Sequence, residues 1–243
     1  MKLLFHIHSS HSFDAVMSVS SILRKCRKLG IDGVVICDHN TFANQKEITE
    51  YGRKFDVLTI PAIEYATELG DIIGLFVNRQ INSRDMGRII ESIKEQDGLS
   101  VLPHPLKNHH KLPRKLLEQI DIIEVYNSRC SEKQNESAQL LAEDIGKPTI
   151  AGSDAHFFWE LQNAIVEFAY NPSGRELNGK DMKQMFLQSP ANYRCRESSL
   201  VNIFLSQLVK AVKLKNPNLI ISLVINLILG LKRKVFMKTA KPE

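Results

Sequence analysis

Histidines and carboxylates in the first 156 residues are the side chains of this sequence best suited to do chemistry together. His6 and His8 are separated by one residue within an apolar run. Because side chains alternate along a strand, both imidazoles would face one side, as two ligands of one metal ion must. The HxH pair alone is weak evidence, since two polar residues on an exposed strand face would look the same. The apolar surroundings favour the metal-ligand hypothesis.

Acidic residues, or other residues that commonly bind metal ions, also follow most of the other short apolar runs. In a parallel βα barrel, the carboxyl ends of all strands open on one face, so these side chains would converge on one pocket. An open sheet gathers its ligands between only a few strands, which makes a closed or nearly closed barrel the better explanation. The residues at the ends of successive runs are His6 with His8, Asp38 with His39, Glu64, His104, Asn127, and Asp154 with His156.

The runs alternate with segments of helical pattern, which predicts repeated βα units and a mostly parallel sheet. The register around Ile72 is uncertain, because Asp71 begins that run and does not end it. Predicted strands are 3–7, 33–37, 57–63, 72–77, 99–102, 120–125 and 149–151, and predicted helices are 18–29, 43–55, 84–96 and 131–145.

Taken together, the motifs resemble those of the polymerase and histidinol phosphatase superfamily of metal-dependent phosphoesterases. The resemblance covers roughly residues 1–195. It is highly specific for the superfamily and only weakly specific for its individual members. The fold that it implies is a distorted seven-stranded (βα)7, TIM-like barrel. The motifs are HxHSSHSFD (6–14), CDHN (37–40), IE (63–64), PHP (103–105) and GSDAH (152–156).

The resemblance also implies two or three divalent metal ions, held in three groups of ligands. The mixed imidazole and carboxylate set suits manganese, zinc or iron. The implied groups are His6, His8, Glu64 and Asp154 for one ion, Glu64 and His104 for a second, and Asp14, His39 and His156 for a third.

Two residues depart from the superfamily pattern. Leu4 stands where relatives commonly have an acidic residue, so a supporting hydrogen bond to a ligand is expected to be missing. Asp71 stands where many relatives have a histidine, and we expect it to bind the second ion through oxygen. An oxygen ligand there would favour manganese or magnesium over zinc.

The expected chemistry is hydrolysis of a phosphate ester by in-line attack of a metal-bound hydroxide. Asp154 and His156 are the candidate catalytic residues for proton transfer, although their role as ligands has priority. Lys107 and Arg129 lie nearest to predicted strand ends and are the candidate substrate-binding residues. A solvated loop explains the basic stretch after His104 about equally well.

The positive charge of the chain lies in its last 46 residues. The formal net charge is +5, and residues 198–243 contain eight Lys or Arg against Glu243 alone. We predict a barrel over 1–197 and a basic, apolar helical tail over 198–243, whose second helix would run over 219–231. Three hypotheses compete for this tail: an interfacial helix on anionic lipid, a helix that binds a partner protein or a second copy, and a helix packed on the barrel.

The predicted function is that of a hydrolase acting on a nucleotide, an oligonucleotide end or a small phosphomonoester. An alternative is a catalytically weak metal-binding module that acts through its tail at a membrane or partner protein. A third hypothesis keeps the hydrolysis but changes the substrate to a phosphorylated protein or a saccharide phosphate. Four scattered cysteines without a CxxC pair and a short apolar N-terminus predict a cytoplasmic protein, with membrane association through 198–243 as a further hypothesis.

Overall fold

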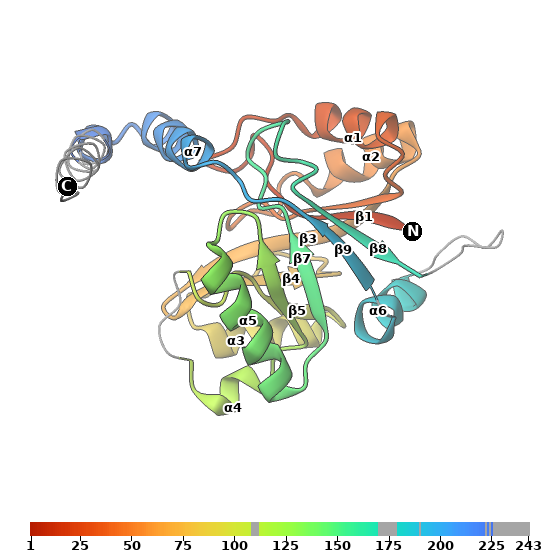
Figure 1. Cartoon of the computed structure of the whole chain (residues 1–243). Helices are drawn as coiled ribbons and strands as arrows, with labels where there is room; N and C mark the ends of the chain where they lie inside the picture. Colours follow the sequence, from red (N-terminus) through yellow and green to blue (C-terminus); the bar gives the residue numbers. More distant parts are fainter. Residues whose placement is uncertain (108–111, 170–178, 190, 222, 224, 226–243) are drawn as a thin grey trace, which may run out of the picture.

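A single nine-stranded sheet organises the molecule, in the order β7-β6-β5-β4-β3-β2-β1-β8-β9 (Figure 1). The computed structural model describes residues 1–107, 112–169, 179–189, 191–221, 223 and 225. The strands are β1 Lys2–Ile7, β2 Gly33–Ile36, β3 Leu58–Thr67, β4 Gly70–Leu75, β5 Leu99–Leu102, β6 Ile122–Asn127, β7 Thr149–Gly152, β8 Ala164–Phe168 and β9 Ala191–Cys195. The helices are α1 Val19–Lys28, α2 Gln45–Phe55, α3 Met86–Glu95, α4 Arg114–Leu117, α5 Glu132–Ile145, α6 Gly179–Gln188 and α7 Leu200–Lys213.

The sheet closes on itself where the segment after β7 meets β1. The amide of Ser153 donates to the carbonyl of Phe5 at 3.0 Å, and the amide of Ala155 donates to the carbonyl of His6 at 3.2 Å. The amide of His8 returns a bond to the carbonyl of Ala155 at 3.0 Å. These bonds lie at the carboxyl ends of β1 and β7, which confirms the predicted, nearly closed barrel.

The strand β4 runs antiparallel to both of its neighbours, which corrects the expected βα repeat at this point. Only Glu68 and Leu69 separate β3 from β4, and so short a connection can join only antiparallel strands. The start of β4 therefore lies at the same end of the barrel as the carboxyl ends of the parallel strands. Asp71, which pairs with Ala66 of β3, is brought to the mouth of the barrel although it opens its strand.

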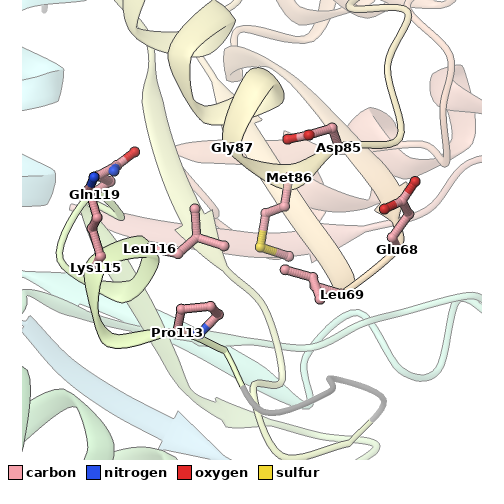
Figure 2. Close-up of a pocket in the computed structure, with 9 residues that line it drawn as sticks. All are labelled: Glu68, Leu69, Asp85, Met86, Gly87, Pro113, Lys115, Leu116 and Gln119. Atoms are coloured by element: carbon pink, nitrogen blue, oxygen red, sulfur yellow. The ribbon is translucent and has the colours of Figure 1, made fainter.

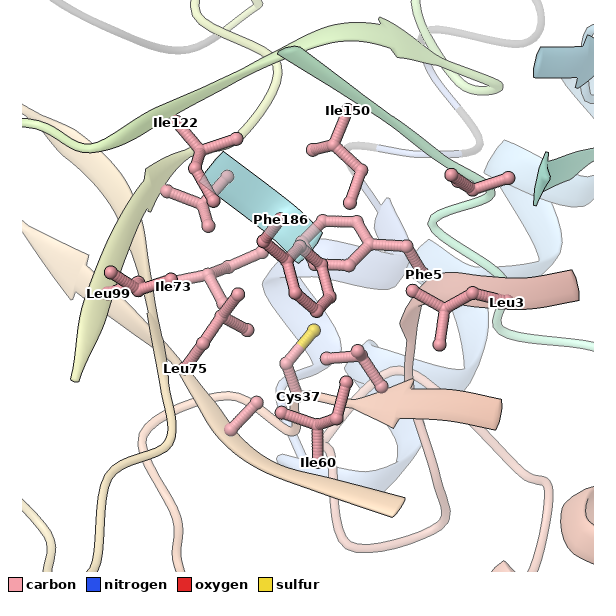
Figure 3. Close-up of a cluster of buried hydrophobic side chains, with 14 of the residues drawn as sticks. Leu3, Phe5, Cys37, Ile60, Ile73, Leu75, Leu99, Ile122, Ile150 and Phe186 are labelled. Carbon is pink, nitrogen blue, oxygen red and sulfur yellow. The ribbon is translucent and has the colours of Figure 1, made fainter. Parts of the chain in front are cut away.

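The interior of the barrel is filled by side chains that point inward from the strands (Figure 3). Phe5 of β1, Ile73 of β4 and Ile150 of β7 point toward one another from different strands around the barrel, and all three are buried. Phe186 of α6 enters the same cluster together with Met182 and extends the apolar core of the barrel. The sequence patterns did not predict α6, β8 or β9. The last two extend the sheet beyond β1 in antiparallel pairing.

Four predicted helices form close to their expected positions and cover the outside of the sheet. Two apolar clusters join them to the strands, one beneath α1 and α2 and the other beneath α3 and α5. Ser18 caps α1 by accepting from the amide of Ser21, and Ser131 forms a capping box with Gln134 at the start of α5. Gly146 ends α5 at a φ of 62°, a conformation that glycine adopts without strain.

The predicted first tail helix is present as α7, which follows β9 and contacts the body of the molecule (Figure 1). The chain is helical again over 217–221, after an interruption over 214–216 that separates α7 from the second helical segment. Most of the predicted second helix, 219–231, lies outside the described residues. Among the helices that the structure describes, none combines the length and apolar character needed to cross a bilayer.

Candidate metal centre

Nearly all of the predicted ligands meet at the mouth of the barrel, and the first group is the most compact. The Nε2 atoms of His6 and His8 lie 3.4 and 3.3 Å from the Oε2 of Glu64. The same two nitrogens lie 3.8 and 3.5 Å from the Oδ1 of Asp154. Ligand atoms around one tetrahedral ion at ~2.0–2.2 Å are spaced by about 3.3–3.6 Å. The four side chains therefore have the spacing of a single metal site.

Unpartnered polar atoms support the same interpretation. The Nε2 atoms of His6 and His8 and the Oε2 of Glu64 are buried and, within the described part of the chain, have no hydrogen-bond partner. Leaving a buried polar atom without a partner costs about 1–3 kcal/mol. A divalent ion between these atoms would remove that cost at each of them. The donor set fits a metal ion of the kind predicted from the motifs.

A bulge in β1 aims His6 into the site. The pairing of β1 with β2 shifts register between Leu4 and Ile7, and His6 has a φ of 62°. The imidazoles of His6 and His8 converge as predicted, but through this bulge and not through plain strand alternation. His104 and Asp154 also have positive φ values, 30° and 46°. Such conformations cost about 1–3 kcal/mol each and are concentrated at functional sites.

The second group forms around the other oxygen of Glu64. Its Oε1 lies 3.3 Å from the Nε2 of His104. One ligand atom from each of Glu64, Asp71 and His104 falls within 4.8 Å of the others. The antiparallel β4 thus places Asp71 beside the second group, where the resemblance to the superfamily led us to expect an oxygen ligand. The two oxygens of Glu64 thus face two of the predicted ligand groups.

The third group joins loops that follow three different strands. The Oδ2 of Asp14 lies 3.2 Å from the Nε2 of His156 and 3.4 Å from the Nε2 of His39. His8 belongs to the same cluster, within 4.8 Å. The Nδ1 of His39 also lies 3.1 Å from the Oε2 of Glu64. All three groups are therefore contiguous, as a multinuclear centre requires.

Glu124 is a buried carboxylate that the sequence analysis missed. Its Oε1 is 2.8 Å from the Nδ1 of His6, and its Oε2 accepts from the amide of His104 at 2.8 Å and from Asn127 at 2.9 Å. The expectation that a supporting hydrogen bond is missing because of Leu4 is wrong, since Glu124 supplies one from β6. Glu124 and Asp121 are the two acids of the predicted strand 120–125, and an acid inside that apolar run was the available signal.

Asp38 holds the loop that follows β1. Its Oδ1 accepts from the amide of Ser9 at 2.6 Å and from the hydroxyl of Ser12 at 2.7 Å, and Asn44 donates to its Oδ2. The Oγ of Ser12 lies 3.2 Å from the Nδ1 of His8. Asp38 therefore orients the ligands indirectly, and these serines act as hydrogen-bonding supports.

Proximity to carboxylates controls the protonation of the imidazoles. Burial opposes a charge on His39, but Glu64 and Asp14 outweigh it and raise the pKa of His39 to about 9. For His6, burial is likewise outweighed, here by Glu124 and Glu64, and its pKa is raised well above the usual value. Burial and the neighbouring His39 and His156 lower the pKa of His8 to about 4. Without metal, the raised pKa values of His6 and His39 favour their protonated forms beside the carboxylates.

The acidic ligands hold their negative charge despite burial. For Glu64, burial favours the neutral acid, but His39 and His6 lower its pKa well below the usual range. For Asp154, burial is outweighed by Lys107 and His6, so its pKa is lowered as well. Asp71 differs, because burial and the charge of Glu64 raise its pKa. A cation at the second site would reverse that effect on Asp71.

The two predicted substrate-binding residues have different surroundings. The Nζ of Lys107 lies 3.2 Å from the Oδ2 of Asp154, and its side chain is 25% exposed, so it faces the centre and solvent together. Arg129 is buried, and its Nη2 donates to both oxygens of Glu160 at 3.1 and 2.9 Å. His11 pairs with Glu47 at 2.9 Å and is in none of the potential metal-binding groups of the described residues.

A cavity of about 320 Å³ lies on the flank of the barrel, apart from the ligands (Figure 2). Met86, Leu69, Leu116 and Pro113 point into it from α3, the β3–β4 turn and the segment around α4. None of the predicted ligands lines this cavity. The candidate site for catalysis is therefore the group of converging ligands, and this cavity is a separate feature of the surface.

Comparisons with known proteins agree with this geometry. A family model described as "PHP domain" matches residues 5–144, and one described as "PHP-associated" matches 132–177. The chain is 32% identical over 231 residues to an uncharacterized protein, MJ0417, of Methanocaldococcus jannaschii. That match covers 89% of this chain and 86% of the archaeal protein.

Solved structures share the fold at low sequence identity. A two-domain Bacteroides vulgatus protein containing a predicted PHP-like metal-dependent phosphoesterase matches with a TM-score of 0.66 and 15% identity, over 81% of this chain and 65% of that one. An amidohydrolase from Chromobacterium violaceum, with bound sulfate and no metal, matches with a TM-score of 0.55 and 13% identity, over 65% and 89%. The family match, supported by the metal-ligand geometry, shows that the chain belongs to the PHP domain family.

Proposed function

We propose that this protein is a metal-dependent phosphoesterase that hydrolyses a nucleotide, an oligonucleotide end or a small phosphomonoester. The observation that carries the proposal is the convergence of unpartnered, buried ligand atoms from His6, His8 and Glu64 on one point. Two or three divalent ions, of manganese, zinc or iron with magnesium at the Asp71 position as an option, would complete the site. Bound ions supply water activation and stabilise charge on the phosphoryl oxygens.

The protein's own residues hold the reacting groups in place. Asp154 faces the imidazoles of His6 and His8 through Oδ1 and faces Lys107 through Oδ2. A phosphoryl group beside the ions would therefore meet the ammonium of Lys107 at the edge of the ligand set. For Lys107, burial is outweighed by Asp154, so its pKa is raised and the ammonium keeps its charge at neutral pH. Lys107 is our candidate for substrate binding.

Proton transfer is assigned to Asp154 of the first group and His156 of the third group. The Nδ1 of His156 lies 2.9 Å from the backbone carbonyl of Asp154, which is expected to fix the imidazole tautomer with Nε2 directed at Asp14. His156 and Asp154 would carry a proton from the attacking water to the leaving group when they are not fully engaged by metal. Arg129, held by Glu160, is given a positioning role instead.

The surroundings favour a phosphate ester over an amide as substrate. Lys107 at the centre and Lys210 and Lys213 on α7 beside the ligand loops provide fixed positive charge for a dianionic group. Four free cysteines, of which Cys26, Cys37 and Cys130 are buried, fit a reducing cytoplasmic location, which we include in the proposal.

The test is release of phosphate or nucleotide from a panel of nucleotides, 5′-phosphorylated oligonucleotides and small monoesters, with manganese supplied. Asp154→Asn should abolish turnover, and Lys107→Met should raise KM more than it lowers kcat. Lys133→Met, which removes an exposed lysine of α5, is the matched charge control and should behave as wild type. Amide hydrolysis without phosphate release, or full activity of Asp154→Asn, would contradict the proposal.

A further inference from the structure

We propose that helix α7 positions the third group of metal ligands, so that metal binding at Asp14, His39 and His156 depends on the C-terminal helix. The inference rests on the proposed function only in assigning a metal ion to that group. Three separate contacts of α7 reach this group, and each ends on the loop or ring of a different ligand. Lys213 is the central residue, as a positioning residue and not a catalytic one.

Lys213 binds the loop that carries Asp14 through three hydrogen bonds. Its Nζ donates to the backbone carbonyls of Ser10, Ser12 and Ala15 at 2.8, 2.8 and 2.7 Å. An ammonium group has three N–H donors, so all of them are used on this one loop. The three carbonyls flank Asp14 on both sides in sequence. Movement of Lys213 would therefore release the backbone that directs the Asp14 carboxylate toward His156 and His39.

Lys210 acts on the second ligand through an aromatic ring. Its Nζ lies 4.6 Å from the ring centre of Phe13, a distance at which a cation is attracted to the ring. Phe13 in turn stacks on His39, with ring centres 4.7 Å apart and planes 7° from parallel. The ammonium of Lys210, the ring of Phe13 and the imidazole of His39 are thus stacked in this order. This stack restricts the rotation of the His39 imidazole.

The third contact runs through a buried ion pair to His156. The hydroxyl of Ser206 on α7 accepts from the Nη1 of Arg129 at 2.8 Å, and the Nη2 of Arg129 binds Glu160. The Oε2 of Glu160 accepts from the amides of His156 and Phe157 at 3.0 and 3.1 Å. Glu160 is fully buried, so its position is closely determined. The loop of His156 is therefore linked to the middle of α7.

Apolar packing holds α7 only in part, because most of its apolar side chains are half-buried or exposed. Along α7, Ser206 and Ala211 are the buried residues, whereas Leu200, Val201 and Val212 are more than 60% exposed. Polar and cation–π contacts therefore account for much of the attachment of α7. Because these contacts end on the ligand loops, the position of the helix and the geometry of the third metal group are coupled.

The experiment is a manganese titration of the 243-residue chain and its variants, followed by calorimetry and by metal analysis after gel filtration. Asp14→Asn first identifies the binding step that belongs to the third group. Lys213→Met should weaken that same step by roughly 10–100-fold, as loss of a residue that orients ligands does. The step that depends on His6, which lies outside the third group, should be unchanged. Lys213→Arg, which keeps donors for the carbonyls, should restore most of the affinity.

The controls separate positioning from general stability and from turnover. Lys133→Met removes an exposed lysine from α5 and should bind metal as wild type does. Lys210→Met, which cuts the contact to Phe13, should weaken the same step independently of Lys213. Unchanged affinity at the Asp14-dependent step in both Lys213→Met and Lys210→Met would overturn the inference. Because metal binding is measured without substrate, absence of phosphoesterase activity would reject the proposed function and leave this result intact.

Discussion

His6 depends on Glu124 for the orientation of its imidazole. The hydrogen bond of 2.8 Å between Glu124 and the Nδ1 of His6 leaves Nε2 directed at Glu64 and Asp154. With its proton on Nδ1, the imidazole can offer the lone pair of Nε2 to a metal ion. The same carboxylate holds the amide of His104, so one residue supports ligands of two groups. Gly152 is required beside it, because a Cβ there would overlap the Oε1 of Glu124.

Glu124→Gln is therefore expected to weaken metal binding by roughly 10–100-fold, while the chain still folds. The amide preserves the size of the side chain but removes the charge that supports the imidazole. Chelator competition with zinc or manganese measures the change. Glu136→Gln, an exposed position on α5, is the matched control and should leave the affinity unaltered. Wild-type affinity in Glu124→Gln would show that His6 is oriented without it.

Metal affinity is also expected to rise with pH up to about 9. Glu64 and Asp14 overcome the effect of burial and raise the pKa of His39 to about 9, and the pKa of His6 is raised as well. At a pH below these pKa values, a metal ion must displace protons from the imidazoles. This competition from protons disappears as the pH rises through each pKa. Manganese titrations at pH 7, 8 and 9 under anaerobic conditions measure this. A flat profile would mean that both rings are neutral in the metal-free protein.

At the scale of elements, β6, β7 and β1 must approach closely to form the first metal group. Gly152 ends β7, and a side chain there would press on Glu124 and lie 2.9 Å from the Cβ of His6. The register of β6 and β7 shifts between Glu124 and Tyr126, which turns the carboxylate toward β1. The close approach of these strands is therefore tied to a glycine that carries no ligand itself.

Gly152→Ala should destabilise the metal-free protein by about 1–3 kcal/mol, the usual cost of overpacking a rigid core. Denaturant unfolding in the presence of chelator measures it. Gly179→Ala is the matched control, because a Cβ at Gly179 meets nothing within 4 Å. That control should be neutral or slightly stabilising at the start of α6. Equal stability of the two variants would show that β7 can shift away from Glu124.

At the level of the whole molecule, the candidate metal centre lies where the barrel closes. The bond from Ser153 to Phe5 and those of Ala155 with His6 and His8 join β7 to β1 directly beside the ligands. Asp14, Glu64 and Asp154 bring three carboxylates to the same place. Metal ions there would both neutralise the carboxylates and hold the last strand of the barrel to the first.

Removal of metal by a chelator should therefore lower the stability of the entire barrel in one transition. At a free metal concentration 100 times Kd, one bound ion contributes about 2.7 kcal/mol. For a chain of this size, that corresponds to a shift in Tm of roughly 5–10 °C. Thermal unfolding with manganese and with chelator measures the shift. Asp154→Asn, which lacks one ligand, should show a smaller shift, and an equal shift would place the stabilising ion elsewhere.

Local patterns predicted much of the fold for a definite physical reason. Alternating apolar runs and capped helices report burial and capping that act over a few residues, so β1 to β7 and four helices lay close to their expected positions. The strands β8 and β9 and helix α6 were missed because their short segments acquire an apolar environment only through packing on β1 and on the barrel interior.

The types of the candidate ligands and their place at the ends of strands could be predicted from the sequence alone, because both are local properties. The sequence could not determine the direction of β4, which follows from the tight β3–β4 turn and carries Asp71 to the mouth. It could not show that Glu124 replaces the acid absent at Leu4, since those residues belong to different strands. Only tertiary structure revealed the contacts of α7, because Lys213 and Ser12 are 201 residues apart and meet through folding alone.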